Sequence, residues 1–468
     1  MSQKQKAPKR GGFLRNFFNL LFRGGNHVVY ASPLEEEQMR SPMRTMVANF
    51  FGKRLAVTGL VLILLVMVLC FSLSAIFPLN LYYQDVTQQN VAPGFHLMSM
   101  PAALQKDLAC MDTGATFGIG ADSKGKAYMW GHLPGKLGKI PKEAADIVMV
   151  SAGSDHVLAL TREGKVVTWG NKRFKLDQIP KEVKNAPGIK QLGAGDQFSL
   201  ALTTEGKLYF WGNGNLISMS QSAIGKDVQG HIEEISVNAD NVLLLMDDST
   251  LRVLGIKATP MHNVPAVVQG HVVDIATSKD ATIALTDDGK VYAWGNDKYG
   301  LLAVPETLQG RTARIEAGRN HFIAITTDGK AVAWGDNMHG QSDVPEAVGL
   351  SGAHQVVRLY SDYYQNYAFD ETGALHSWGL RGYLMGTDGY GRDIFRRLVA
   401  GGRMTLTVGA VAVLISMVIG VLIGGLAGFY GGKVDDLLMR FAEIMGAIPF
   451  LPFAMTLSAV IGNNVSET

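Results

Sequence analysis

The sequence is poor in cysteine, and this excludes a disulfide framework. Cys70 and Cys110 are the two cysteines among 468 residues, and Cys70 lies inside a long apolar run that Cys110 could hardly reach. No histidine or cysteine cluster has the spacing of a zinc site. A Gly-x-x-x-x-Gly-Lys-[Ser/Thr] phosphate loop is also missing, and no Ser/His/Asp arrangement is convincing. We therefore expect no catalytic residue, no metal and no cofactor.

Charge is scarce as well. Charged residues make up 18% of the chain and the formal net charge is +2, so strong affinity for nucleic acid is not expected. Two runs carry no charge at all: 23 residues over 55–77 and 27 residues over 404–430. A helix needs about 20 apolar residues to cross a bilayer. Both runs predict transmembrane helices.

A third uncharged run covers 444–461 and contains two prolines, so it predicts a third span that the prolines would kink. Residues 1–54 carry ten Lys or Arg, whereas residues 78–105 carry none. By the positive-inside bias, the N-terminus is expected in the cytoplasm. The apolar residues of 13–22 favour either a short interfacial helix or a basic tail that orients the first span.

Tryptophan-glycine pairs recur between the first two spans. Their spacings are 39, 42, 83, 40 and 44 residues, and the gap of 83 contains a degenerate copy at Leu254-Gly255. Seven repeats of about 40 residues have the size of propeller blades. The six intact copies begin at Trp130, Trp169, Trp211, Trp294, Trp334 and Trp378.

Each repeat reads as short strands joined by a tight turn. In the clearest copy, Phe322 to Ile325 forms one strand, Asp328-Gly329 the turn, and Ala331 to Trp334 the next strand. Seven such units closed in a ring bury apolar faces that one unit leaves exposed. We expect the tryptophans to pack blades rather than form a ligand cage. His156 and His321 occupy equivalent positions, so they are expected in the repeat core rather than at a metal.

The pattern Ala-Gly-x-x-His-x-x-Ala-Leu-Thr, as at Ala152 to Thr161, resembles the regulator-of-chromosome-condensation family. Repeats of that family form seven-bladed propellers. The resemblance covers about Met111 to Gly379 and is weak at 238–246 and 361–369.

The segment after the repeats resembles a different family. Its pattern Gly-Thr-Asp-x-x-Gly-Arg-Asp precedes the second uncharged run, which ends Ala-Gly-Phe-Tyr-Gly-Gly at Gly432. This order resembles the C-type permease subunit of oligopeptide and dipeptide ABC importers, as does the stretch Ser41 to Leu60. The family usually has His-Pro-Leu where this chain has Tyr383-Leu384-Met385. The motif residues are Gly386, Thr387, Asp388, Gly391, Arg392 and Asp393.

The permease resemblance implies a role in transport. The chain would form one half of a pathway that works by alternating access, and it would not itself be an enzyme. Its implied partners are a second permease subunit, two ATP-binding ABC subunits, an external solute-binding protein and the lipid bilayer. The family's cytoplasmic coupling helix, with its Glu-Ala-Ala motif, has no counterpart here, so we expect the sequence to be truncated.

Two groups of residues are expected to have structural roles. Asp388 is expected to cap a helix that contains Arg392, and the neighbouring arginines are expected to anchor at the interface rather than contact substrate. In the second span, glycines spaced by four share one helix face, which favours close packing of a neighbouring helix over mere flexibility. These are Gly420, Gly424 and Gly428.

The sequence therefore predicts a membrane α-helical protein, like a type I ABC importer permease, with an all-β seven-bladed propeller in its first external loop. It would be a multi-pass plasma-membrane protein with an external propeller. The alternative is a membrane-anchored interaction protein with a non-transporting permease remnant, and nucleotide exchange on a GTPase rests on fold analogy alone. The expected parts are a cytoplasmic tail 1–54, helix 55–77, external linker 78–110, propeller 111–379, external amphipathic segment 380–403, helix 404–430, cytoplasmic loop 431–443, helix 444–461 and an external end 462–468.

Overall fold

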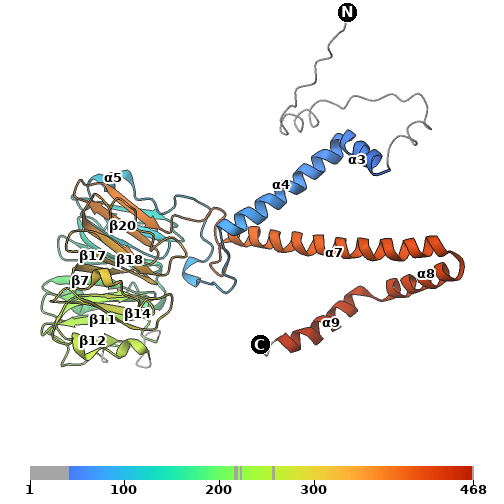
Figure 1. The fold of residues 1–468 in the computed structure, drawn as a ribbon. Helices are drawn as coiled ribbons and strands as arrows, with labels where there is room; N and C mark the ends of the chain where they lie inside the picture. The colour runs from blue at the N-terminus through green and yellow to red at the C-terminus, as the bar shows by residue number, and fades with distance from the viewer. Residues whose placement is uncertain (1–41, 216–219, 222–223, 256–258, 466–468) are drawn as a thin grey trace, which may run out of the picture. The chain divides into compact units, whose positions relative to one another are not determined.

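The computed structural model describes residues 42–215, 220–221, 224–255 and 259–465. The chain divides into two compact units (Figure 1). One contains Leu81–Phe395, and the other combines Met1–Asn80 with Arg396–Thr468. The basic tail predicted for 1–54 lies outside the described residues up to position 41, and it is helical over α3, Pro42–Gly52.

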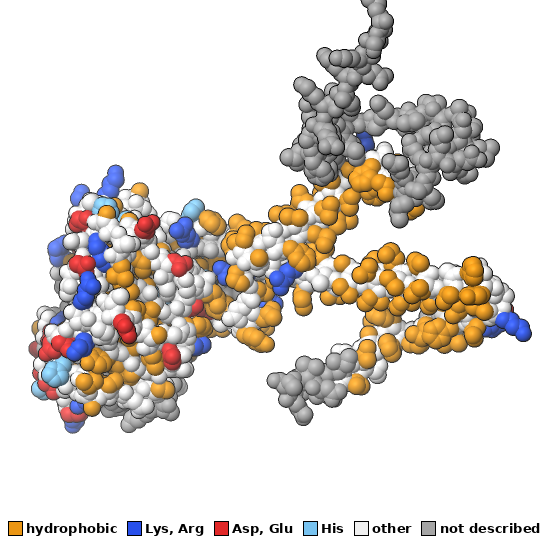
Figure 2. Space-filling model, viewed as in Figure 1, with side chains coloured by type: hydrophobic (Ala, Val, Ile, Leu, Met, Phe, Trp, Pro, Cys, Tyr) orange, Lys and Arg blue, Asp and Glu red, His pale blue; other side chains and the backbone are white. Residues whose placement is uncertain are grey.

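The described part of the smaller unit is helical, and two of its helices are long and apolar. Helix α4, Arg54–Ile76, and helix α7, Ile394–Tyr430, are each long and apolar enough to cross a membrane. Their hydrophobic side chains are largely exposed (Figure 2), which suits contact with lipid better than contact with water. The arginine-rich residues 394–403, expected as a separate segment, form the first turns of α7.

The polar patch expected to form a loop at 431–443 is helical instead. It forms most of α8, Gly432–Ala447, where Lys433, Asp436, Arg440 and Glu443 recur three or four residues apart and so share one side. Helix α9, Phe450–Val465, follows after a bend of 75°. The bend falls at Ile448, which is extended because the following proline disfavours a helical conformation there. The bent pair counts as a third candidate span.

Seven antiparallel sheets of three strands each form the propeller. Each sheet uses three consecutive strands in chain order, so the predicted seven-bladed architecture is confirmed. The blades are β1 Cys110–Thr113, β2 Phe117–Ala121 and β3 Ala127–Gly131; β4 Ile147–Ala152, β5 His156–Thr161 and β6 Val166–Gly170; β7 Ile189–Ala194, β8 Phe198–Thr203 and β9 Leu208–Gly212; β10 Ile232–Asn238, β11 Asn241–Met246 and β12 Leu251–Leu254; β13 Val272–Thr277, β14 Ala281–Thr286 and β15 Val291–Gly295; β16 Thr312–Ala317, β17 His321–Thr326 and β18 Ala331–Gly335; β19 Val356–Asp362, β20 Gln365–Asp370 and β21 Leu375–Gly379.

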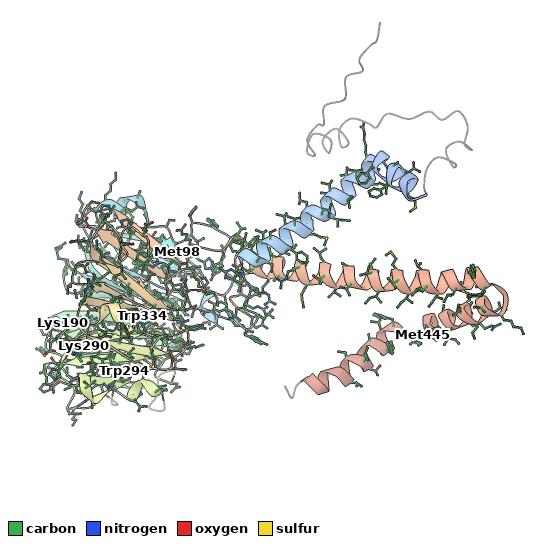
Figure 3. All side chains as sticks on the ribbon, viewed as in Figure 1. Met98, Lys190, Lys290, Trp294, Trp334 and Met445 are labelled. Carbon is green, nitrogen blue, oxygen red and sulfur yellow. The ribbon has the colours of Figure 1, made fainter. Side chains whose placement is uncertain are left out.

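The tryptophans pack the blades, as their spacing indicates. All six are buried, and in five of them the indole N–H donates to a carbonyl of the connector that leads into the same blade. Trp334, for example, donates to Leu301 O at 3.0 Å. A buried indole needs such a partner because an unpaired N–H would cost free energy. Figure 3 shows Trp294 and Trp334 among the strands of their blades.

The backbone conformation explains why a glycine follows each tryptophan. All seven, including Gly255 of the degenerate copy, have φ between +96° and +127°, where a side chain is strained. A Cβ at Gly335 would also lie 2.8 Å from Asn320 O. The weak repeat therefore keeps the glycine although it lacks the tryptophan.

The ring closes between the first and last blades without exchanging a strand. Trp130 has no preceding blade, so its indole donates to Tyr367 Oη at 3.2 Å, and Tyr367 Oη donates to Met98 O at 2.6 Å. Arg358 Nη1 donates to Leu108 O at 2.7 Å. Residues expected to form a linker thus fold against the ring, with Leu104 fully buried in the short helix α5, Ala102–Lys106.

Substituting Gly335 with alanine should destabilise the propeller more than substituting Gly164. Both residues have positive φ, which costs roughly 1–2 kcal/mol for alanine. The new methyl group at Gly164 meets open space, whereas at Gly335 it meets backbone. Thermal unfolding of the detergent-solubilised chain measures the difference, and equal costs would contradict the close contact with Asn320.

Candidate functional site

The predicted permease motif lies in a structure that joins the two ends of the propeller. We call residues 81–99 and 380–393 the collar. Five backbone hydrogen bonds of 2.8–3.1 Å connect its two segments, although nearly 300 residues separate them. The pairs are Met98 N to Arg381 O, Gly94 N to Tyr383 O, Thr387 N to Val91 O, Asn90 N to Asp388 O and Asp85 N to Tyr390 O.

Thr387 is the buried centre of the collar. Its hydroxyl donates to Gln88 O and accepts from Val91 N at 2.8 Å. Tyr383, at a position where the family usually differs, donates its hydroxyl hydrogen bond to Gln88 Oε1. Thr387 and Tyr383, both in the collar segment 380–393, therefore hold the segment 81–99 in place.

Glycine is required twice in the motif because backbone lies where a side chain would be. Gly386 has φ +76°, and a Cβ there would lie 2.4 Å from Val91 O. Gly391 has φ +71°, and its Cβ would lie 1.8 Å from Asp85 O. Alanine at either position would force the two collar segments apart.

Asp388 closes a turn ahead of α7. One carboxylate oxygen accepts from the N–H groups of Tyr390 and Arg392 at 2.9 and 3.0 Å, and the other accepts from Arg392 Nε at 2.8 Å. Partial burial alone would raise the pKa of Asp388, but hydrogen bonds from Arg392 and Tyr390 lower it to about 2. Because α7 begins at Ile394, Asp388 does not cap a helix that contains Arg392. Asp393 directly precedes α7, and its backbone forms a bridge with Thr387.

The glycines of α7 have no close neighbour in the part of the chain that is described. A Cβ at Gly420, Gly424 or Gly428 would meet no atom within 4 Å. The predicted close packing of a neighbouring helix on this face of α7 therefore stays a prediction.

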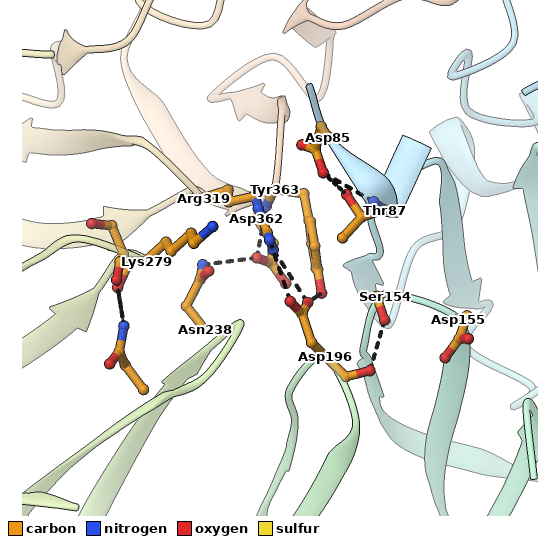
Figure 4. Close-up of polar contacts among 12 residues, drawn as sticks. Asp85, Thr87, Ser154, Asp155, Asp196, Asn238, Lys279, Arg319, Asp362 and Tyr363 are labelled. Atoms are coloured by element: carbon orange, nitrogen blue, oxygen red, sulfur yellow. Dashed lines mark hydrogen bonds and ion pairs between the residues drawn. The ribbon is translucent and has the colours of Figure 1, made fainter. Parts of the chain in front are cut away.

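Side chains from distant blades meet across the ring next to the collar (Figure 4). Arg319 of the sixth blade is 5% exposed, and its guanidinium pairs with the Asp196 carboxylate of the third blade at 3.2 and 3.3 Å. Tyr363 Oη donates to the same carboxylate at 2.8 Å. Tyr364, the next residue, donates to the Asp85 carboxylate in the collar. A buried charge pair is tolerated only with such additional partners.

The first strands of the blades line a cavity of about 280 Å³, and Asp362 is among the residues that line it. Glu316 accepts from Arg314 Nη2 at 2.6 Å, and Asp112, Glu234 and Asp362 line the same wall. Burial raises the pKa of Glu316 to about 7, against the effect of Arg314 and helped by Asp274 and Asp112. Burial also raises the pKa of Glu234 to about 7, helped by Asp274 and Glu316. At neutral pH this wall is only partly ionised.

Sequence reasoning located the motif but not its partners. Asp85, Gln88 and Val91 lie about 300 residues from the motif in sequence, and only Asp85-Val86-Thr87 carries a local signal. There the Asp85 carboxylate accepts from Thr87 N at 3.0 Å and caps a short 3-10 helix, Val86–Gln88. His156 and His321 are fully buried in the blades, which agrees with their predicted place in the repeat core.

Two family models match the chain. Residues 41–93 match the N-terminal transmembrane domain of oligopeptide transport permease C. Residues 147–174, 189–216, 272–301 and 313–341 match the regulator of chromosome condensation (RCC1) repeat. Both resemblances seen in the sequence are thus confirmed.

Curated relatives are peptide permeases. The oligopeptide transport system permease protein OppC of Haemophilus influenzae is 42% identical over 87 residues, which are 18% of this chain and 28% of that protein. The di/tripeptide permease DppC of Pseudomonas aeruginosa is 40% identical over 95 residues, 20% of this chain and 31% of that one. The chain thus spans less than a third of the length of these two relatives.

Solved structures similar to this chain include Prp20p from Saccharomyces cerevisiae, with 18% identity and a TM-score of 0.43, covering 64% of this chain and 93% of that one. Another is the CRINKLY WD40 ectodomain of the Arabidopsis thaliana receptor kinase ACR4, with 13% identity and a TM-score of 0.43, covering 58% and 96%.

Two glycines of the motif provide a matched test of the collar. Gly391→Ala should cost at least about 2 kcal/mol of stability, because positive φ and the contact with Asp85 O add. Gly389→Ala, whose methyl group would meet no atom within 4 Å, should change stability by less than about 0.5 kcal/mol. Thermal unfolding checks both, and equal effects would refute the tight packing at Gly391.

Glu316→Gln should stabilise the propeller at alkaline pH. The pKa of Glu316 rises from its ordinary value of 4.5 to about 7, so the stability it contributes is complete below pH 4.5 and is lost as pH rises through 7. Glutamine mimics the protonated form, and at pH 8 we expect a gain of roughly 1–2 kcal/mol. The exposed Glu163→Gln is the control. Unfolding is measured at pH 4.5 and pH 8 for both proteins. An equal stability difference between wild type and Glu316→Gln at the two pH values would contradict this account.

Proposed function

Because the chain carries the N-terminal transmembrane domain of a peptide permease together with an RCC1-repeat propeller, we propose that it is a membrane subunit of an ABC importer for dipeptides or oligopeptides. The propeller is a platform for an external protein, and the solute-binding protein of the importer is the partner we favour. ATP hydrolysis belongs to separate subunits, and this chain supplies part of the pathway.

The observation that carries the proposal is the joining of the permease segments in the collar. The permease match covers residues 41–93, and the Gly-Thr-Asp motif resumes at Gly386. Gly94 N donates to Tyr383 O at 2.8 Å, so the two sides of the insertion meet directly. A domain whose ends lie this close can be inserted into a loop without separating the flanking helices.

The topology we propose follows from charge. Ten Lys or Arg lie in residues 1–54, and none occurs between residues 78 and 105, which favours a cytoplasmic N-terminus. An odd number of spans then separates the N-terminus from the propeller. We therefore propose that the propeller is external and that α8 lies on the cytoplasmic side.

The end of the propeller away from the collar suits a protein partner. Its blade turns carry charges of both signs in exposed pairs, such as Lys165 with Glu163, Lys207 with Glu205 and Lys290 with Asp288. Figure 3 shows Lys190 and Lys290 on the edge of the propeller away from Met98, which belongs to the collar. A rim of mixed charge favours specific protein contact over binding to nucleic acid.

Uptake of a labelled dipeptide tests the proposal. The locus encoding the chain should restore uptake to a strain that lacks its own C-type permease. A variant that joins Gly94 to Tyr383 through a two-residue turn, and so omits residues 95–382, should still insert but should lose most uptake. Full uptake by this variant would exclude an essential docking role for the propeller. No uptake with the intact chain would instead support a membrane-anchored interaction protein.

A further inference from the structure

A hydrogen bond that two of the blades make to the blade that follows has no counterpart where the ring closes. His156, the first residue of β5, contacts Ser199 Oγ of the next blade through Nε2 at 3.0 Å. His321, the first residue of β17, contacts Asn366 Oδ1 of the next blade at 2.8 Å. In the last blade the residue equivalent to these histidines is Gln365, the first residue of β20. The position equivalent to Ser199 and Asn366 in the first blade is Gly118, the second residue of β2.

Gly118 cannot provide a partner. It has no side chain, and the Trp130 ring lies 2.2 Å from the place where its Cβ would be. Gln365 is 2% exposed, and neither Oε1 nor Nε2 has a hydrogen-bond partner among the described residues. A buried primary amide without partners costs about 1–3 kcal/mol, so it favours a ligand that can pair with it.

Gln365 lines a cavity of about 260 Å³, which we call the seam cavity. The last blade forms one wall of this cavity, and the collar residues Met98, Ser99 and Arg381 form another. Trp378 also lines it, but its indole N–H is already donated to Gln341 O. The volume lies just below the range of about 300–1,000 Å³ that is usual for small-molecule pockets, so the cavity suits a ligand the size of a dipeptide.

Four other glutamines show what a glutamine amide binds in this fold. The amide of Gln191 accepts from Ile235 N at 2.9 Å and donates to Ile235 O. One glutamine amide thus binds both backbone polar groups of a single extended residue. The same bidentate contact joins Gln229 to Leu208, Gln269 to Leu251 and Gln309 to Val291. The free amide of Gln365 offers the same donor and acceptor to a ligand.

Arg381 adds a preference for negative charge. Arg381 is one of the residues that line the seam cavity, it is exposed, and its guanidinium forms no ion pair with any residue that the structure describes. A guanidinium can bind a carboxylate through two parallel hydrogen bonds. A free amide and an unpaired guanidinium at the same cavity match the end of a peptide, where one extended residue is followed by a carboxylate.

We propose that the seam cavity binds the C-terminal end of a short, extended peptide. The Gln365 amide pairs with the N–H and C=O of one residue, and Arg381 binds the terminal carboxylate. The inference is drawn from the seam alone and does not require that the chain transports peptides. Because collar and last blade both line the cavity, an occupied site strengthens the closure of the ring.

Calorimetric titration of the solubilised full chain with Ala-Ala tests the proposal. We expect saturable binding that Gln365→Met weakens on the order of tenfold, which corresponds to one lost pair of hydrogen bonds. This variant should fold, because it replaces an unpaired buried amide by an apolar side chain of similar length. Unweakened binding by Gln365→Met, or no saturable binding by wild type, would overturn the proposal and leave a cavity that holds water.

Arg381→Gln separates the two contacts. It should weaken binding of Ala-Ala but leave binding of Ala-Ala amide, which has no carboxylate, unchanged. The exposed Arg162→Gln is the matched control and should bind like wild type. Equal losses for Ala-Ala and its amide would overturn the role of Arg381.

The variant without residues 95–382 separates this site from a transport pathway. It lacks the seam cavity but keeps the helices, so it should bind no Ala-Ala. Binding that persists there would place the site in the membrane unit and overturn the proposal, whatever the result for uptake. A pentapeptide that ends in Ala-Ala distinguishes two sources of the ligand. If the pentapeptide binds as tightly as Ala-Ala, the ligand can be the C-terminus of a partner protein. If only Ala-Ala binds, the ligand is a free short peptide.

Discussion

The fold depends on bringing together two chain segments almost 300 residues apart. Gly391 makes this possible because its missing side chain leaves room for the Asp85 carbonyl, and Thr387 then bonds with both Gln88 and Val91. Once these segments meet, the ends of the propeller are fixed, and its first and last blades can close through Trp130 and Tyr367. No strand is shared between them, so ring closure relies on side chains and on the collar.

The same region contains the polar groups that are most expensive to bury. The pair Arg319–Asp196 crosses the ring, and Tyr364 extends this network to Asp85 in the collar. Desolvation offsets much of the attraction between such buried charges, but loss of one partner would leave the other charge buried and unpaired, which is costly. In this chain the network ties the third, sixth and last blades to the collar. The unpaired Gln365 amide lies at the same end, where the repeat is interrupted.

Local features were predictable, and distant pairings were not. The blade count follows from the Trp-Gly spacing because each pair solves one packing problem with φ values that glycine tolerates. The apolar helices follow from runs without charge. The partnership of Asp85 with Gly391 carries no sequence signal, since only the folded ring brings them together. Asp388 was expected to cap a helix, but local spacing does not distinguish a helix cap from a closed turn. The polar run 431–443 was interpreted as a loop because it is too polar for a span, although its charged residues recur at the helical spacing of the amphipathic α8.

Cysteine accessibility tests the central claim, an external propeller inserted between permease helices, most directly. In a chain with Cys70 and Cys110 replaced by serine, one cysteine is introduced at Lys165 in an exposed blade turn or at Lys433 in α8. A membrane-impermeant maleimide should label Lys165→Cys in intact cells and Lys433→Cys only after permeabilisation. Protection of Lys165→Cys in intact cells, with labelling after permeabilisation, would place the propeller in the cytoplasm and contradict the account.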